Sequence, residues 1–135
     1  MLVLSKKGKM DEGKMALQGV RGAITVEQDN EDQIIAATKN LLFEIVKANQ
    51  TMKTEDLACV FFTMTDDLHS GFPAKAAREM GWRNVPLMCS TEISVTNGLP
   101  FCIRVLLLWN TNMLQTEISH VYLGRAKTLR PDLLK

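Results

Sequence analysis

The sequence of 135 residues has little cysteine, little histidine and no long apolar run. Its three cysteines, Cys59, Cys89 and Cys102, are odd in number and form no CxxC pair, so we expect no disulfide framework. The two histidines lie far apart in the sequence, which gives a zinc site little support. Apolar runs such as residues 105–109 have only the length of a strand, whereas a membrane span needs about 18–20 residues.

The sequence also lacks an excess of either charge and the common cofactor motifs. It has 16 Lys and Arg against 15 Asp and Glu, a formal net charge of +1, so no broad basic field for nucleic acid is expected. No P-loop, GxGxxG, GxSxG or HExxH motif occurs. Free thiols and the lack of a secretory leader favour the cytoplasm. We therefore expect no nucleic acid, membrane, metal or other cofactor.

The length suits one compact domain, and 46% of the residues are hydrophobic, which is typical of globular proteins. Residues 1–16 are rich in Lys and Gly, lack periodicity and contain three methionines. We expect them to be a disordered leader, or an artefact of start-site choice with Met15 as the true start. Residues 17–135 are then the single domain.

Strand and helix patterns alternate along that domain. A helix of about twenty residues begins after Asp29 or Asn30, and a second follows Pro73, a favoured first residue of helices. Asn97-Gly98 predicts a two-residue turn. Apolar and β-branched segments predict strands at 17–27, 57–65, within 85–95, at 101–111 and at 119–129. About five strands and two main helices indicate an α+β fold, a mixed sheet with the helices on one face.

Two arginines occupy apolar strand segments. Arg104 shares a strand face with Leu106 and Leu108, where an unpaired guanidinium costs several kcal/mol and needs an anion. An internal carboxylate, water at a sheet edge or a bound ligand could meet it. Arg21 lies among small residues and is either exposed or a second ligand group. Together they favour a carboxylate or phosphate ligand, because the planar guanidinium binds such groups in a bidentate manner.

Other polar residues are weaker candidates. Glu92 could pair with an arginine or accept a hydrogen bond from a ligand hydroxyl. Cys89 has no neighbouring histidine to activate it, so a small buried filler is the simpler interpretation. Tyr122 fits a core position with a hydroxyl that needs a partner. Lys75 and Arg78 share a helix face that is either solvated or part of a site. The residues alone thus predict a small α+β domain that binds an anionic metabolite.

Five segments carry a specific resemblance: VRGAITVE (20–27), DLHSGFPAKAAREMG (67–81), VPLMCSTEI (85–93), CIRVLLLWNT (102–111) and HVYLGRAKTLRPDL (120–133). In this order and spacing the chain resembles the monofunctional AroH-type chorismate mutases. The resemblance implies an isomerase that rearranges chorismate to prephenate without a cofactor, on the shikimate route to phenylalanine and tyrosine. It also implies a homotrimer, a pseudo-α/β-barrel with active sites between subunits.

The same resemblance implies roles for particular residues. Arg104 would contact the ether oxygen, Arg21 and Tyr122 would bind the enolpyruvyl carboxylate, and Glu92 would accept from the ring hydroxyl beside Cys89. The other implied pocket residues are Phe72, Ala74, Lys75 and Arg78 from the neighbouring subunit, Leu87 and Met88 in the wall, and Leu129 and Arg130 in a C-terminal segment over the site. Met88 stands where many relatives carry a small polar residue.

Two other functions remain open at this stage. A non-catalytic trimeric protein on the same scaffold could bind or sense a carboxylate metabolite, and imine or enamine deaminases also use an arginine for a substrate carboxylate. The segments above do not resemble those deaminases. The full set of Arg104, Glu92 and Arg21 favours the enzyme over the binding protein.

Overall fold

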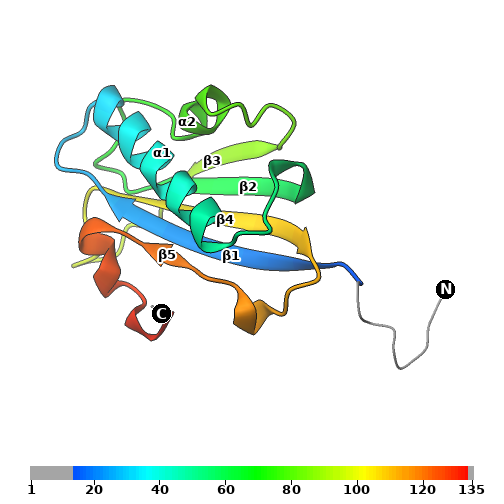
Figure 1. Ribbon diagram of the computed structural model, residues 1–135. Helices are drawn as coiled ribbons and strands as arrows, with labels where there is room; N and C mark the ends of the chain where they lie inside the picture. Colours follow the sequence, from blue (N-terminus) through cyan, green and yellow to red (C-terminus); the bar gives the residue numbers. More distant parts are fainter. Residues whose placement is uncertain (1–13, 134–135) are drawn as a thin grey trace.

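The computed structural model describes residues 14–133, which form one mixed sheet with two helices (Figure 1). The prediction of a leader at residues 1–16 therefore lies almost wholly outside the described residues. The strands are β1 (Ala16–Thr25), β2 (Leu57–Met64), β3 (Leu87–Thr91), β4 (Cys102–Thr111) and β5 (Val121–Tyr122). The helices are α1 (Glu31–Ala48) and α2 (Ala74–Glu79), with short 3-10 turns η2 (Thr54–Asp56), η3 (Gln115–Glu117), η4 (Gly124–Thr128) and η5 (Pro131–Leu133).

The sheet has the order β3-β2-β4-β1-β5. The central strand β4 pairs antiparallel with β1 and β2, whereas the outer pairs β2–β3 and β1–β5 are parallel. Five strands in a mixed sheet with two helices confirm the predicted α+β class. Among the described residues, no helix is both long and apolar enough to cross a membrane.

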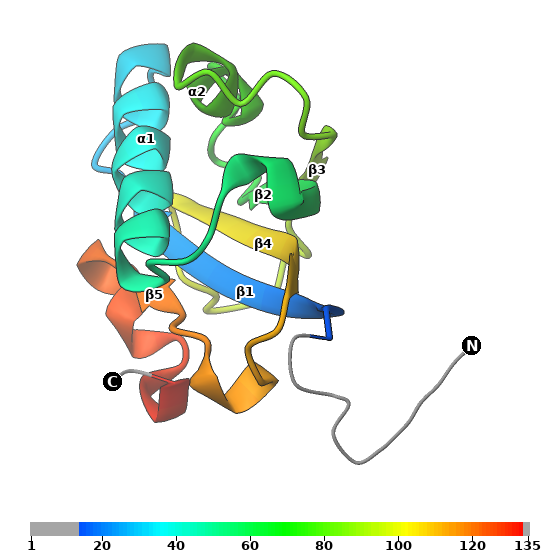
Figure 2. The same cartoon turned by 45° about the vertical axis from the view of Figure 1, so that its right-hand side comes forward.

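One face of the sheet, called here the covered face, packs against α1 and α2, which lie on the same side (Figures 1 and 2). Asn30, one of the two residues predicted to precede the helix, caps α1, because its side chain accepts a hydrogen bond from the Gln33 backbone N–H at 2.8 Å. The helix buries a stripe at helical spacing: Ile34, Ile35, Thr38, Leu41, Leu42 and Ile45. Phe62, Leu107 and Trp109 meet this stripe from the sheet and complete the main core.

The opposite face, called here the open face, carries exposed apolar side chains, including Leu17, Phe61, Met88 and Leu106. At one end it is covered by the C-terminal turns, where η4 packs on β1. There a second, smaller cluster forms from Ala23, Cys102, Tyr122 and Ala126. The C-terminal turns therefore lie over one end of the open face, and the middle of that face has no element packed against it among the described residues.

Two local predictions were wrong. The strand predicted at 119–129 is confined to Val121–Tyr122, because Gly124 (φ 62°) turns the chain into η4. The turn predicted at Asn97-Gly98 lies one residue earlier, since the Gly98 N–H donates to the Val95 carbonyl and Asn97 has φ 65°. It joins no hairpin, because β2 lies between β3 and β4.

Candidate functional site

A cleft of about 550 Å³ opens on the bare part of the open face, next to the C-terminal turns. Strands β1, β2 and β4 form its floor, and the C-terminal segment with Leu129 forms one side. Its polar lining consists of Arg21, Thr63, Glu92, Arg104, Tyr122 and Arg130. Six of the predicted site residues line this one cavity: Arg21, Glu92, Arg104, Tyr122, Leu129 and Arg130.

The sheet register explains why the two arginines meet. Arg104 in β4 is the Cα partner of Ala23 in β1 and of Thr63 in β2. Directly paired residues point to the same side of a sheet, and side chains alternate along each strand. Arg21, two residues before Ala23, therefore shares the open face with Arg104. The alternation that exposes these polar groups also buries Val105, the residue after Arg104, on the covered face.

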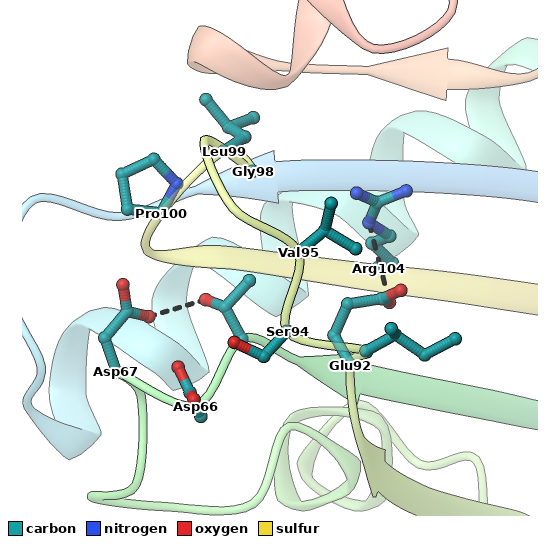
Figure 3. Close-up of a pocket in the computed structure, with 11 residues that line it drawn as sticks. Asp66, Asp67, Glu92, Ser94, Val95, Gly98, Leu99, Pro100 and Arg104 are labelled. Atoms are coloured by element: carbon teal, nitrogen blue, oxygen red, sulfur yellow. Dashed lines mark hydrogen bonds and ion pairs between the residues drawn. The ribbon is translucent and has the colours of Figure 1, made fainter.

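Arg104 forms a loose ion pair with the carboxylate of Glu92 but no hydrogen bond to it. Its Nε lies 3.6 Å from Glu92 Oε1, beyond hydrogen-bond distance (Figure 3). That Nε is buried and has no hydrogen-bond partner among the described residues. The Arg104 side chain as a whole is 41% exposed, so the rest of the guanidinium remains accessible. An orphaned donor on an accessible cation is an arrangement that an anionic ligand can complete.

Glu92 follows the end of β3 and is fixed at both its backbone and its side chain. Its N–H donates to the Met64 carbonyl at 2.8 Å, and its Oε1 accepts from the Thr63 hydroxyl at 2.5 Å. Its side chain is 23% exposed. Thr63 was missed at the sequence level. The available signal was a hydroxyl in an apolar strand segment, on the face shared with Arg104.

The other two cleft arginines differ in their partners. Arg130 donates to both carboxylate oxygens of Asp132 from Nε (3.0 Å) and Nη2 (2.8 Å). These hydrogen bonds raise the pKa of Arg130 and lower the pKa of Asp132. Arg21 is exposed, and its side chain forms no ion pair with the residues that the structure describes. Arg21 and the exposed part of the Arg104 guanidinium are thus cationic groups of the cleft that can still bind an anion.

The loop between β3 and β4 closes the other side of the Glu92–Arg104 pair over a cavity of about 290 Å³ (Figure 3). Asp67 anchors this loop, because its two carboxylate oxygens accept from the Phe101 N–H at 3.0 and 3.2 Å. Phe101 has φ 52°, a conformation that these bonds help to hold. The Thr65 hydroxyl donates to Asp67 and accepts from Cys102 N–H. Sequence reasoning also missed this anchor.

The remaining predicted residues lie elsewhere in the same chain. Cys89 is the Cα partner of Phe62 and packs against the main core, so it faces away from Arg104. With Phe72 it lines a separate groove of about 430 Å³. Of the other predicted residues, Leu87 is half-buried beside Cys89, Met88 projects from the open face, Ala74 is buried in α2, Arg78 is exposed, and Lys75 pairs with Glu31 at 3.3 Å.

Cysteine and metal chemistry find little support among residues 14–133. Burial raises the pKa of the Cys102 thiol, although nearby Arg104 opposes the shift, so this sulfur is held as the neutral thiol. No group of three or more His, Cys, Asp or Glu side chains in this part of the chain is placed to hold a metal ion. The chemical resources of the cleft are therefore cations, one carboxylate and hydroxyl groups.

The fold and the cleft define a class of protein: a small α+β domain with an arginine-lined pocket on the open face of its sheet. The chain belongs to the chorismate mutase type I family, whose model matches residues 17–133. It is 50% identical over 117 residues to chorismate mutase AroH of Thermus thermophilus, covering 87% of this chain and 96% of that one. It is 48% identical over 120 residues to chorismate mutase AroH of Bacillus subtilis (strain 168), covering 88% and 94%.

A solved structure gives the same result. The fold matches a chorismate mutase from Clostridium thermocellum with a TM-score of 0.79 and 44% sequence identity, over 81% of this chain and 96% of that one. The family predicted from the five sequence segments is therefore confirmed.

Proposed function

We propose that this chain is a chorismate mutase, an isomerase of aromatic amino-acid biosynthesis that rearranges chorismate to prephenate in the arginine-lined cleft. Family membership over residues 17–133 supports the reaction. The observation that carries the assignment of the site is the buried, unpartnered Nε of Arg104 beside the fixed carboxylate of Glu92. Free cysteines favour the cytoplasm as the compartment.

The reaction explains why such a site suffices. The rearrangement is intramolecular and pericyclic, so it requires neither a nucleophile nor a proton transfer. A protein can accelerate it by holding the dicarboxylate in its compact conformer and by stabilising charge as the ether bond breaks. A million-fold acceleration asks for about 8 kcal/mol, which positioning and one well-placed cation can supply.

In this proposal Arg104 contacts the ether oxygen and the enolpyruvyl carboxylate. Arg21 and the hydroxyl of Tyr122 bind the same carboxylate, and Glu92 accepts from the ring hydroxyl while offsetting positive charge on the ring. The common cavity of these four side chains supports the assignment. Leu129 and Arg130 flank the bound substrate from the C-terminal segment, where Asp132 holds the Arg130 guanidinium.

We further propose that the site is completed by a second subunit in a homotrimer. Four of the predicted pocket residues do not line the arginine cleft of their own chain. Phe72 and Cys89 line the separate groove instead, and Lys75 and Arg78 belong to the nearby helix α2. A neighbour could bring them, with Ala74, Leu87 and Met88, against it. The exposed apolar side chains on the open face supply a surface that such an assembly would bury.

Mixing variants tests this shared site. Arg104→Ala and a Lys75→Ala/Arg78→Ala double variant should each be weakly active, and refolding them together should restore a fraction of the wild-type activity. Light scattering at the same concentration should give the mass of three chains. No restoration by a mixed assembly would place the whole site within one chain.

The reaction itself is tested by adding chorismate to the purified protein with a chelator present. We expect rapid loss of chorismate and formation of prephenate at an undiminished rate. Tight binding of chorismate without conversion would instead favour the non-catalytic binding protein, because the arginines would then bind a carboxylate without lowering the barrier.

A further inference from the structure

We infer that Thr63 is a positioning residue that holds the Glu92 carboxylate beside Arg104 and keeps their ion pair from tightening into a hydrogen bond. The inference rests on the proposed function, because it concerns how the cleft keeps its central cation available to the substrate. Nothing in the resemblance described above gives Thr63 a role.

The geometry places Thr63 opposite the reacting centre. It is the Cα partner of Arg104 across the β2–β4 ladder, and both side chains project from the open face. Its hydroxyl donates to Glu92 Oε1 at 2.5 Å, and the same oxygen lies 3.6 Å from Arg104 Nε. The same carboxylate oxygen thus accepts a hydrogen bond from the neutral Thr63 hydroxyl but none from the charged Arg104 Nε.

The backbone of Glu92 does not by itself decide this choice. Its N–H is fixed on the Met64 carbonyl, so only side-chain torsions separate the observed ion pair from one closed by a hydrogen bond. The distance from Nε to Oε1 exceeds a normal N–H···O bond by about 0.7 Å. Without the Thr63 hydroxyl, the carboxylate oxygen would still have the buried Nε of Arg104 3.6 Å away, a donor that lacks a hydrogen-bond partner.

Closure of that pair would harm the reaction in two ways. A charge-assisted bond between Glu92 and Arg104 would satisfy the orphaned donor and offset the positive charge that the ether oxygen needs. It would also draw the carboxylate away from the position proposed for the ring hydroxyl. The hydroxyl of Thr63 therefore keeps this ion pair free of a direct hydrogen bond, so that the cation and the anion can each still bind the substrate.

Thr63→Val removes the hydroxyl at nearly constant shape, and Thr63→Ser retains it. We expect Thr63→Val to lower kcat/KM about ten- to a hundred-fold, the range for one hydrogen bond to a charged group, with Thr63→Ser within about threefold of wild type. The matched control is Thr111→Val at the far end of β4, which loses a hydroxyl bond to Met113 N–H and should keep full activity. The melting temperature of each folded variant should fall only by the amount expected for the hydrogen bond that it has lost. Thr63→Val and Thr111→Val should therefore be destabilised to a similar degree, although only Thr63→Val loses activity.

A double-mutant cycle distinguishes positioning from direct contact with the substrate. If Thr63 acts through Glu92, Thr63→Val should cost little further in a Glu92→Gln background. In a crystal structure of Thr63→Val, the Arg104 Nε to Glu92 Oε1 distance should shorten to that of a hydrogen bond. Where Thr63→Val does not fold, Thr63→Ala takes its place in both experiments.

Wild-type kcat/KM in Thr63→Val, or losses that add fully to those of Glu92→Gln, would overturn the inference. A failure of the proposed function looks different, because the wild-type protein would then not convert chorismate at all. The two failures are separated by measuring wild type and variants in the same assay.

Discussion

The two faces of the central strand β4 differ in role, because one packs in the core and the other lines the cleft. On the covered face Ile103, Val105, Leu107 and Trp109 are at most 4% exposed and pack against the helices. On the open face, Arg104 lies between them in sequence and lines the cleft with a buried donor left unpaired. Because side chains alternate between the two faces of a strand, neighbouring residues of β4 contribute in turn to the stability of the core and to the candidate site.

The difference follows from what each face can exclude. The covered face excludes water by close packing and contains few polar groups, so its free energy comes from apolar burial. The open face keeps charged groups partly hydrated, which lowers the cost of leaving them unpaired until a ligand arrives. Substitutions on the two faces should therefore change different measurements.

The largest expected effect is on the open face. Arg104→Ala should lower kcat at least about a thousand-fold, because it removes the cation proposed at the ether oxygen. Steady-state turnover of chorismate measures the loss. Thermal unfolding should change little, since Nε makes no hydrogen bond within the described part of the chain.

Arg104→Lys separates charge from geometry at the same position. Lysine keeps one positive charge but lacks the planar fork, so most of the activity should still be lost. Turnover near the wild-type value in Arg104→Ala would remove this residue from the mechanism. A large fall in melting temperature would instead give the open face a structural role and weaken the contrast between the faces.

The next effect belongs to the covered face. Leu107→Ala should lower the free energy of unfolding by about 3 kcal/mol, because it leaves a cavity in a fully buried site. Leu106, its neighbour on the open face, is 38% exposed in the single chain, so the loss of contacts within that chain in Leu106→Ala should cost less than half as much, and any larger loss would come from the proposed contact between subunits. Denaturant titration at one protein concentration measures both. Equal losses would show that another subunit buries the open face as deeply as the helices bury the covered one.

Two glycines of β1 give a smaller test of packing. A Cβ at Gly22 would lie 2.7 Å from Ile45 Cδ1 and 3.1 Å from Leu41 Cδ1, whereas one at Gly19 would meet Leu106 Cδ1 at 3.6 Å. Gly22→Ala should therefore cost about 1–3 kcal/mol of stability through overpacking. Gly19→Ala should be nearly neutral by the same titration. Equal effects would contradict the idea that only the covered face is closely packed.

Sequence reasoning recovered the covered face better than the open one. The long helix and its start after Asp29 or Asn30 follow local rules, and the structure confirms the helix and selects Asn30 as its cap. The strand predicted at 119–129 failed, because β5 is held by pairing with β1, far away in sequence, and Gly124 ends it. Tertiary pairing therefore overrode local strand propensity.

The candidate site was predicted in part for a physical reason. An arginine in an apolar strand is conspicuous because its burial is costly, so Arg104 and Arg21 could be found from the sequence. Thr63 and Asp67 are ordinary in composition and gain their roles only from register and loop geometry. The location of Cys89 on the opposite face from Arg104 also required the register of β2 with β3.

The smallest expected effect tests a residue that belongs to both functions. Tyr122 is 7% exposed, packs its ring in the small cluster with Ala23 and Cys102, and lines the cleft. Tyr122→Phe keeps the ring and removes the hydroxyl proposed to bind the substrate carboxylate, so kcat/KM should fall about three- to tenfold, mainly through KM. Melting temperature should stay within the error of the wild-type value, because the apolar packing is unchanged. A loss of stability without a change in KM would assign the hydroxyl to the fold. The separation of stability from function would then fail at a side chain that both packs in a core cluster and lines the cleft.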